Sequence, residues 1–147
     1  MDAINKELDN IHLRRHQLIF LVTDDFKEDI RFVSDGLEVP YININLELSK
    51  MLQDIPFKKR PRIINELVKK IVRDKENDIL VIDHIEILFD PQLHHNPVLL
   101  LEDLSRNFKL IVAWRGQCNK QKIIYAEPDH DEYFTHDNTE GIIIEYN

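Results

Sequence analysis

Three uninterrupted apolar runs constrain the fold of this chain more than any other feature. They are residues 17–23, 78–83 and 109–114, which read QLIFLVT, DILVID and KLIVAW. A strand with one face in water alternates apolar and polar residues, whereas a strand covered on both faces reads as a continuous apolar run. Such strands are typical of a parallel sheet with helices on both sides. We therefore predict an α/β fold with a mostly parallel sheet flanked by helices.

Stretches with helical spacing of apolar residues alternate with these runs. The longest predicted helix begins at Pro61, since proline is tolerated in the first turn, and its apolar residues up to Val72 form one stripe. Shorter helices are expected at 2–14, 25–36 (ending at Gly36), 46–54 and 97–107, and further strands at 40–45, 121–126 and 141–146. The last two strands are expected to add antiparallel edges. With no repeat or linker, residues 1–147 are predicted to form one three-layer domain.

The net charge, the cysteine count and the lengths of the apolar runs limit the classes of function that this chain can have. The net charge is −8 over 147 residues, so long-range electrostatics disfavour polyanions such as free nucleic acid. Cys118 is the single cysteine, which excludes an internal disulfide and fits a reducing compartment. No apolar run approaches the ~20 residues that span a bilayer, and the N-terminus lacks the features of a secretory signal. We expect a cytoplasmic protein without a membrane contact.

Asp83 ends the second apolar run and has the form of a Walker B carboxylate. In open parallel sheets ligands bind beyond the carboxyl ends of the strands, and a terminal Asp there can orient a magnesium-bound water. The alternative is structural, because Asp at a strand end also caps the helix that follows. Spacing alone leaves both interpretations open.

The segment after the first run stands where a P-loop NTPase has its phosphate-binding loop. That loop needs glycines whose backbone N–H groups wrap the phosphates, a lysine and a hydroxyl residue. A window from Thr23 to Ile30 contains no glycine, and Glu28, Asp29 and Ile30 replace the second glycine, the lysine and the hydroxyl residue. The phosphate-binding loop is therefore predicted to be degenerate.

Acidic residues dominate this turn. Asp24, Asp25, Glu28 and Asp29 are expected to satisfy the free N–H groups at the helix N-terminus and to repel a triphosphate. Lys27 is more consistent with a surface partner of these carboxylates. The remnant nucleotide-site candidates are Thr23, Asp24, Lys27 and Asp83.

We expect no resident metal and no cofactor. The alternative is a site in which Asp24, Asp25 and Asp83 together bind a divalent cation. His94, His95 and His130 lack the Cys pairs or the His-Glu-x-x-His spacing of zinc sites and are interpreted as surface or loop residues. No nucleophile framework is present.

Two further groups are candidates for contacts with macromolecules. Lys58, Lys59, Arg60 and Arg62 form a basic run that fits either nucleic-acid contact or a solvated helix start. Partner-binding candidates are Arg106, Asn107, Trp114 and Arg115, at predicted helix and strand ends. The two arginines could act across a subunit boundary, or they could be helix-end charges that interact with the helix dipole. Trp114 could anchor a partner or be a core residue.

Several segments together resemble a known family. They are PYININLELS at 40–49, ILVIDHIEILFDP at 79–91, LLEDLSRN at 100–107, LIVAW at 110–114 and YAEPDHDEY at 125–133. In this order they resemble the small P-loop-containing protein of BREX phage-defence systems, the BrxF family. The resemblance runs from about residue 16 to residue 134.

The resemblance implies a P-loop NTPase-like fold, a bacterial host and a role in excluding phage DNA. It also implies work beside a large ATPase, a DNA methyltransferase and a phosphatase-like protein. Members of the family follow their first strand with Gly-x-x-x-x-Gly-Lys-Thr, and this chain departs from the family there, so only Asp83 carries over.

Three functional hypotheses follow. The leading one is a non-hydrolysing interaction subunit of a defence complex, possible also as a homo-oligomer. The second is a weak or partner-assisted ATPase, in which Mg-ATP would be held with help from Lys27 or a neighbouring subunit's Arg106. The third is a DNA-contacting accessory protein that uses the basic run from Lys58 to Arg62.

Overall fold

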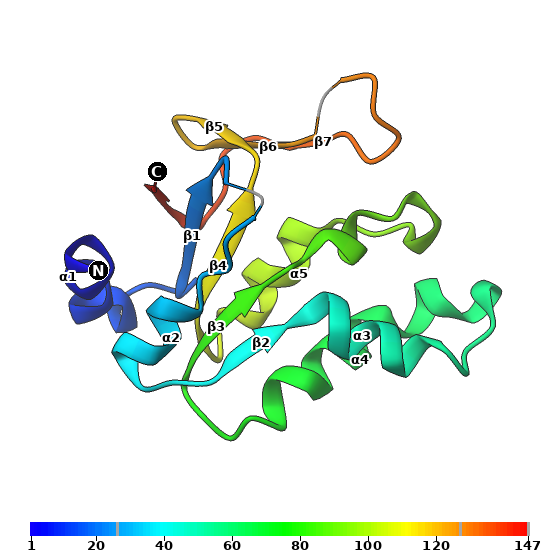
Figure 1. Cartoon of the computed structure of the whole chain (residues 1–147), viewed down its shortest axis with the longest axis horizontal. Helices are drawn as coiled ribbons and strands as arrows, with labels where there is room; N and C mark the ends of the chain where they lie inside the picture. The colour runs from blue at the N-terminus through cyan, green and yellow to red at the C-terminus, as the bar shows by residue number, and fades with distance from the viewer. Residues whose placement is uncertain (26, 127, 147) are drawn as a thin grey trace.

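The computed structural model describes residues 1–25, 27–126 and 128–146 (Figure 1). Phe26 and Glu127 fall in the predicted loop window and in a family-like segment, and both lie outside the described residues. The centre of the structure is a sheet of five parallel strands in the order β2-β3-β4-β1-β8. Their bounds are β1 (Leu18–Thr23), β2 (Tyr41–Asn43), β3 (Ile79–Asp83), β4 (Lys109–Arg115) and β8 (Ile142–Glu145). The predicted α/β class and parallel sheet are confirmed.

The edge formed by β8 corrects one prediction. β8 runs parallel to β1, with Ile19 opposite Ile142, rather than antiparallel. The antiparallel strands form a separate three-stranded sheet in the order β5-β6-β7, which projects beyond the carboxyl end of β4 (Figure 1). These strands are β5 (Gln117–Asn119), β6 (Lys122–Tyr125) and β7 (Phe134–His136). Strands this short, in a polar segment, carry too weak a pattern for β5 and β7 to be predicted.

Helices cover both faces of the parallel sheet (Figure 1). α1 (Asp2–Asn10) and α2 (Arg31–Leu37) pack on one face, where Ile19, Leu21 and Ile111 point. α3 (Ile44–Leu52), α4 (Arg60–Arg73) and α5 (Pro97–Leu104) cover the other face, toward which Phe20 and Val112 point. Short 3-10 turns join these elements at Ile11–Leu13, Phe57–Lys59, Glu86–Phe89 and Pro91–Leu93. Every residue of β1 is buried, as its apolar run predicts.

The helix after β1 begins later than predicted. α2 starts at Arg31 rather than near residue 25, because the Asp25 and Asp29 side chains accept the N–H groups of Lys27, Glu28 and Arg31 in place of helical carbonyls. The helix ends at Leu37 with Glu38 in the left-handed conformation (φ 57°), so Gly36 lies inside the helix and is not its C-cap. α5 also ends early, at Leu104. Within the described part of the chain, every helix is too short or too polar to cross a lipid bilayer.

Candidate functional site

Asp83 is the centre of a buried polar network at the carboxyl edge of the sheet. It ends β3 and is completely buried. Its Oδ2 accepts hydrogen bonds from the Tyr41 hydroxyl at 2.6 Å and from the Ile30 backbone N–H at 3.0 Å. Its Oδ1 accepts one from the His84 N–H at 2.8 Å and a very short one from Nη1 of Arg115. Both carboxylate oxygens are therefore fully used by the protein itself.

Arg115 is the cationic half of this network. It ends β4, the neighbour of β3, and because parallel strands end at the same edge its side chain reaches Asp83. Only 4% of Arg115 is exposed. Its Nη2 donates to the backbone carbonyl of Glu28 at 2.7 Å, and its Nε has no partner among the described residues. Arg115 therefore joins the ends of two strands to the loop that follows β1.

Four backbone donors of the loop after β1, those of Asp25, Lys27, Glu28 and Ile30, are satisfied by side chains of the chain itself. Thr23 Oγ1, Asp25 Oδ1 and Asp29 Oδ1 accept its N–H groups at distances from 2.9 to 3.3 Å. Thr23 accepts the N–H of Asp25, Asp25 accepts those of Lys27 and Glu28, and Asp29 accepts that of Arg31. The N–H of Ile30 is accepted by Asp83. Backbone N–H groups bind phosphate only when they point at the ligand. These point at the chain's own oxygens.

The network also sets the pKa values of its members. Burial alone would raise the pKa of Asp83, but hydrogen bonds from Arg115, Tyr41 and the Ile30 N–H outweigh it and hold that pKa below the usual value. Burial and the hydrogen bond to Asp83 raise the pKa of the Tyr41 hydroxyl well above its usual value. Asp83 is thus a stable anion held by donors rather than a group ready to exchange protons.

This geometry favours the structural interpretation of Asp83. A Walker B carboxylate needs a lone pair directed at a metal-bound water, and here each oxygen already accepts two hydrogen bonds. Asp83 does cap a helix, although not the segment that follows it. It accepts the N–H of Ile30, the N-cap residue of α2, fifty-three residues earlier in the chain.

The other remnant-site candidates lie around this network without forming a phosphate cradle. Thr23 is 4% exposed, and its hydroxyl oxygen accepts the Asp25 N–H. Asp24 and Lys27 are exposed. Asp83 contacts the loop after β1 through the Ile30 N–H, whereas Thr23 bonds to Asp25 within that loop.

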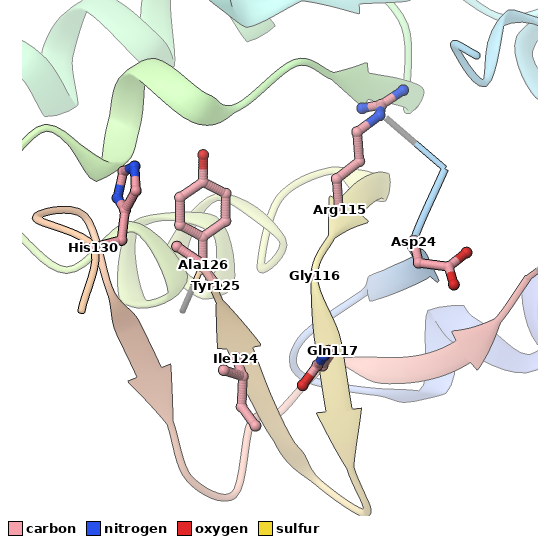
Figure 2. Close-up of a pocket in the computed structure, with 8 residues that line it drawn as sticks. All are labelled: Asp24, Arg115, Gly116, Gln117, Ile124, Tyr125, Ala126 and His130. Atoms are coloured by element: carbon pink, nitrogen blue, oxygen red, sulfur yellow. The ribbon is translucent and has the colours of Figure 1, made fainter. Parts of the chain in front are cut away.

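A pocket of about 270 Å³ opens beside the network, at the carboxyl ends of β1 and β4 (Figure 2). Asp24, Arg115 and Gln117 lie along one side of it, and Tyr125 and His130 along the other. This crevice is the usual place for a ligand in an open parallel sheet. The one guanidinium at its wall is already neutralised by Asp83, and Asp24 adds a negative charge, so the pocket does not suit a phosphate group.

The predicted alternative of a cation between Asp24, Asp25 and Asp83 has no matching geometry. The oxygens of Asp83 are occupied, and among the described residues no group of three or more His, Cys, Asp or Glu side chains is placed to hold a metal ion. His95 Nε2 lies 2.8 Å from the Leu88 carbonyl, and burial lowers its pKa. His130 Nδ1 accepts the Glu132 N–H at 3.0 Å.

Two partner-binding candidates are interior residues, so Trp114 takes the core position that was one of its two interpretations, and Arg115 is not exposed to a partner. Trp114 is completely buried, packs edge-on against Phe20 and Phe89, and donates its indole N–H to the Ile124 carbonyl at 3.0 Å. Arg115 is the buried partner of Asp83. Continuous apolar sequence up to residue 114 was the available sign that Trp114 belongs to the core.

Arg106 and Asn107 are exposed, as their role as partner candidates requires. They follow α5 and precede β4, so they lie at the end of the sheet where the strands begin. They are therefore at the opposite end of the molecule from Asp83.

Three of the four residues of the basic run are exposed, and the fourth, Arg60, is half-buried. Lys58, Lys59 and Arg62 are exposed at the start of α4. Arg60 instead donates to the carbonyls of Leu52 and Ile55 at 2.8 and 3.1 Å, where it caps the end of α3. Its guanidinium also lies over the Phe57 ring, 4.1 Å from the centroid.

Sequence reasoning missed Tyr41 and the carbonyl of Glu28 as members of the network. A tyrosine at the start of a short strand has no signature, and a backbone acceptor leaves none at all.

Comparison with protein-family models, with curated proteins and with solved structures gives no match to this chain.

Proposed function

We propose that this chain is a non-hydrolysing interaction subunit with a P-loop NTPase-like fold. The observation that carries the proposal is the occupied state of the carboxyl edge. The Asp83 carboxylate accepts four hydrogen bonds, and side chains of the protein itself accept the N–H groups of Asp25, Lys27, Glu28, Ile30 and Arg31. A site in which the Asp83 oxygens and most of the nearby donors are already paired has little left to offer Mg-ATP.

Electrostatics supports the same conclusion. Asp25, Glu28 and Asp29 are exposed on the loop where phosphates would sit. Each close contact between like charges costs about 1 to 4 kcal/mol, depending on exposure. Two such contacts offset much of the roughly 8 kcal/mol that micromolar affinity represents. Binding of ATP would also require the Arg115–Asp83 pair to open.

The proposed setting is a bacterial BREX-type phage-defence complex in the cytoplasm. Support for the setting comes from the family-like segments of the sequence. The proposed partners are the large ATPase, the DNA methyltransferase, the phosphatase-like component or a second copy of this chain. Arg106 and Asn107 remain the partner-binding candidates because both are exposed.

Calorimetric titration of the purified protein with Mg-ATP and Mg-ADP tests the loss of nucleotide binding. We expect no saturable heat and no ligand-dependent shift in melting temperature. Saturable binding near micromolar would overturn the proposal and favour the weak ATPase. In that case Asp83→Ala should abolish hydrolysis in a reconstituted complex, whereas Asp54→Ala, an exposed aspartate away from the network, should not.

Co-purification with the other components of the same defence system tests the setting. We expect a stable complex with at least one of them, and loss of phage protection when this chain is deleted. Arg106→Glu should weaken the complex if the proposed surface is used. Lys6→Glu, an equal charge reversal on α1, is the matched control.

A DNA-contacting role is the second candidate, because Lys58, Lys59 and Arg62 are exposed close to Phe57, a residue that is itself 68% exposed. The cationic side chains suit a phosphate backbone, and a base would stack on the face of the Phe57 ring that Arg60 does not cover. Affinity for single-stranded DNA should then fall steeply with salt and with Lys58→Glu. Absence of binding at low salt would remove this candidate.

A further inference from the structure

β8 is the outermost strand on its side of the parallel sheet (Figure 1). Among the strands that the structure describes, it pairs with β1 alone. All six residues of β1 are buried, whereas the three isoleucines of β8, Ile142 to Ile144, are only half-buried. β1 has a strand on each side and β8 has one on its inner side, so the outer edge of β8 leaves apolar side chains partly uncovered.

The hydrogen bonds between β1 and β8 fix which backbone groups face outward. The Tyr146 N–H donates to the Val22 carbonyl at 2.7 Å, and Val22 lies opposite Glu145. Alternate residues of a strand in a parallel ladder direct their backbone groups at one neighbour, so the N–H and C=O groups of Ile143 and Glu145 point away from β1. Outward-facing groups of this kind are what allow an edge strand to accept another strand.

The opposite edge of the sheet, β2, is protected in ways that β8 is not. β2 has three residues, follows Pro40 and passes at Asn43 directly into α3, whose first turn Asn43 caps. Short length and proline are devices by which natural sheets prevent pairing at an edge. β8 has four residues, IIIE, without proline or lysine. Both the sequence and the structure therefore leave β8 suited to pairing.

We propose that β8 pairs with the β8 of a second copy of this chain, antiparallel and about a two-fold axis at Ile143. In this register the Ile143 residues of the two copies exchange both backbone hydrogen bonds, because their N–H and C=O groups face outward. Ile142 lies opposite Ile144 of the partner subunit, and symmetry repeats the pair. Cross-strand pairs of β-branched residues are favourable, so each copy covers the isoleucines that the other leaves half-buried. The proposal rests on the proposed role as an interaction subunit and specifies the second copy named there.

The charges along β8 favour a second copy in this orientation. Arg14 is exposed near the start of β8, where its Nη2 donates to the Glu140 carbonyl at 2.7 Å. Glu145 is exposed at the end of the same strand. Antiparallel pairing about Ile143 places Glu145 of one copy opposite Gly141 of the other, near Arg14, and symmetry forms the contact twice. Parallel pairing in register would bring like charges together instead.

The contact is expected to be weak. Strands of four residues bury less surface than the roughly 1,200 Å² of a standard stable interface, and a net charge of −8 on each copy opposes association. We expect a reversible dimer with a dissociation constant on the order of 10 to 100 μM. Sedimentation velocity of the full chain between about 1 and about 300 μM should show the mass rise from that of a monomer toward that of a dimer.

Hydrogen exchange locates the contact on β8. The Ile143 N–H faces outward in the monomer, and its exchange should slow about three- to eightfold between the lowest and highest concentrations, as the fraction of monomer falls. The Tyr146 N–H already donates to the Val22 carbonyl, so its exchange should not depend on concentration.

Charge reversal tests the antiparallel register. Arg14→Glu or Glu145→Arg alone places like charges together at both contacts and should raise the dissociation constant about fivefold or more. The double variant should restore it, because both pairs re-form with their charges exchanged. Arg73→Glu, at the exposed end of α4, changes the net charge as Arg14→Glu does and should leave the dissociation constant unchanged.

A monomer up to the highest concentration would overturn the pairing of β8. So would a dimer in which neither the Ile143 exchange nor the charge reversals show any effect. These measurements contain no nucleotide, so either result leaves the proposed loss of ATP binding intact and removes only the second copy from the proposed partners. Saturable ATP binding in the calorimetric test would instead refute the proposed function without altering the association measured by sedimentation.

Discussion

The Asp83 carboxylate and the Arg115 guanidinium form a buried ion pair across the carboxyl ends of β3 and β4, thirty-two residues apart in the chain. Their side chains are 0% and 3% exposed. Neither charge has access to bulk water, so each depends on the other. The strength of a buried pair of this kind is seen when one partner is removed, because the remaining charge is left without compensation.

Replacing Asp83 by alanine should therefore destabilise the fold by about 3 to 5 kcal/mol. Urea unfolding followed by the fluorescence of Trp114, the single tryptophan, measures the effect. The double variant Asp83→Leu with Arg115→Met should recover much of the loss, since it removes both buried charges. A double variant less stable than Asp83→Ala would contradict this account.

Stability should fall in acid because of Asp83. Its pKa is lower in the folded state than its ordinary value of 3.8. The carboxylate therefore contributes fully above that value, and the contribution is lost as the pH falls below it toward the folded pKa. Unfolding free energies measured from pH 6 down to pH 2 should show a steeper decline in the wild type than in Asp83→Asn, where nothing titrates at this position.

The Tyr41 hydroxyl should contribute through its hydrogen bond to Asp83. Tyr41→Phe removes a 2.6 Å bond to a charged acceptor and should cost about 1.5 to 2 kcal/mol of stability. It should also raise the pKa of Asp83, since one of the donors that lower it is gone. Tyr133→Phe, at a residue that is 42% exposed, should change neither quantity. Equal effects of the two substitutions would argue against the role given to Tyr41.

The turn at Gly116 should tolerate no side chain. A Cβ there would lie 2.3 Å from the Ile124 carbonyl oxygen, which also accepts the Trp114 indole N–H. Gly116→Ala should thus cost about 1 to 3 kcal/mol by forcing β6 away from β4. Gly36 offers the contrast, since its Cβ would meet only the flexible end of Met1, and Gly36→Ala in α2 should stabilise by up to about 1 kcal/mol. Thermal unfolding should give a lower melting temperature than wild type for Gly116→Ala and a higher one for Gly36→Ala.

Asp25 should keep the 24–30 loop closed. Asp25→Ala frees the N–H groups of Lys27 and Glu28, and their hydrogen exchange should speed up about fivefold or more, as loss of roughly 1 kcal/mol implies. Asp54→Ala is the control. Unchanged exchange at both amides would mean that the loop is held by Asp83 and Arg115 alone.

The sequence predicts the sheet well because both faces of its central strands are apolar. Continuous runs at 17–23, 78–83 and 109–114 became β1, β3 and β4 within one or two residues. The direction of β8 was not predictable, since Ile142–Glu145 carries no signal that distinguishes a parallel from an antiparallel neighbour. The three-residue strands β5 and β7 are too short to show a period, whereas β6 falls within the strand predicted at 121–126.

The site was predicted in part. Acidic residues that satisfy the loop's own donors were expected, and Asp25 and Asp29 do so. The decisive pairing of Asp83 with Arg115 was not expected. Burial of an arginine depends on a partner brought by the strand order, which no local pattern records.

The position of β1 has a consequence for synthesis on the ribosome. Its two neighbours, β4 and β8, are contributed by residues 109–115 and 142–145. A strand that is fully buried in the folded protein thus emerges early and stays unpaired while about ninety further residues are translated, a separation that slows folding and exposes nascent chains to aggregation. Nascent chains arrested before residue 109 should accordingly depend on chaperones that shield hydrophobic segments.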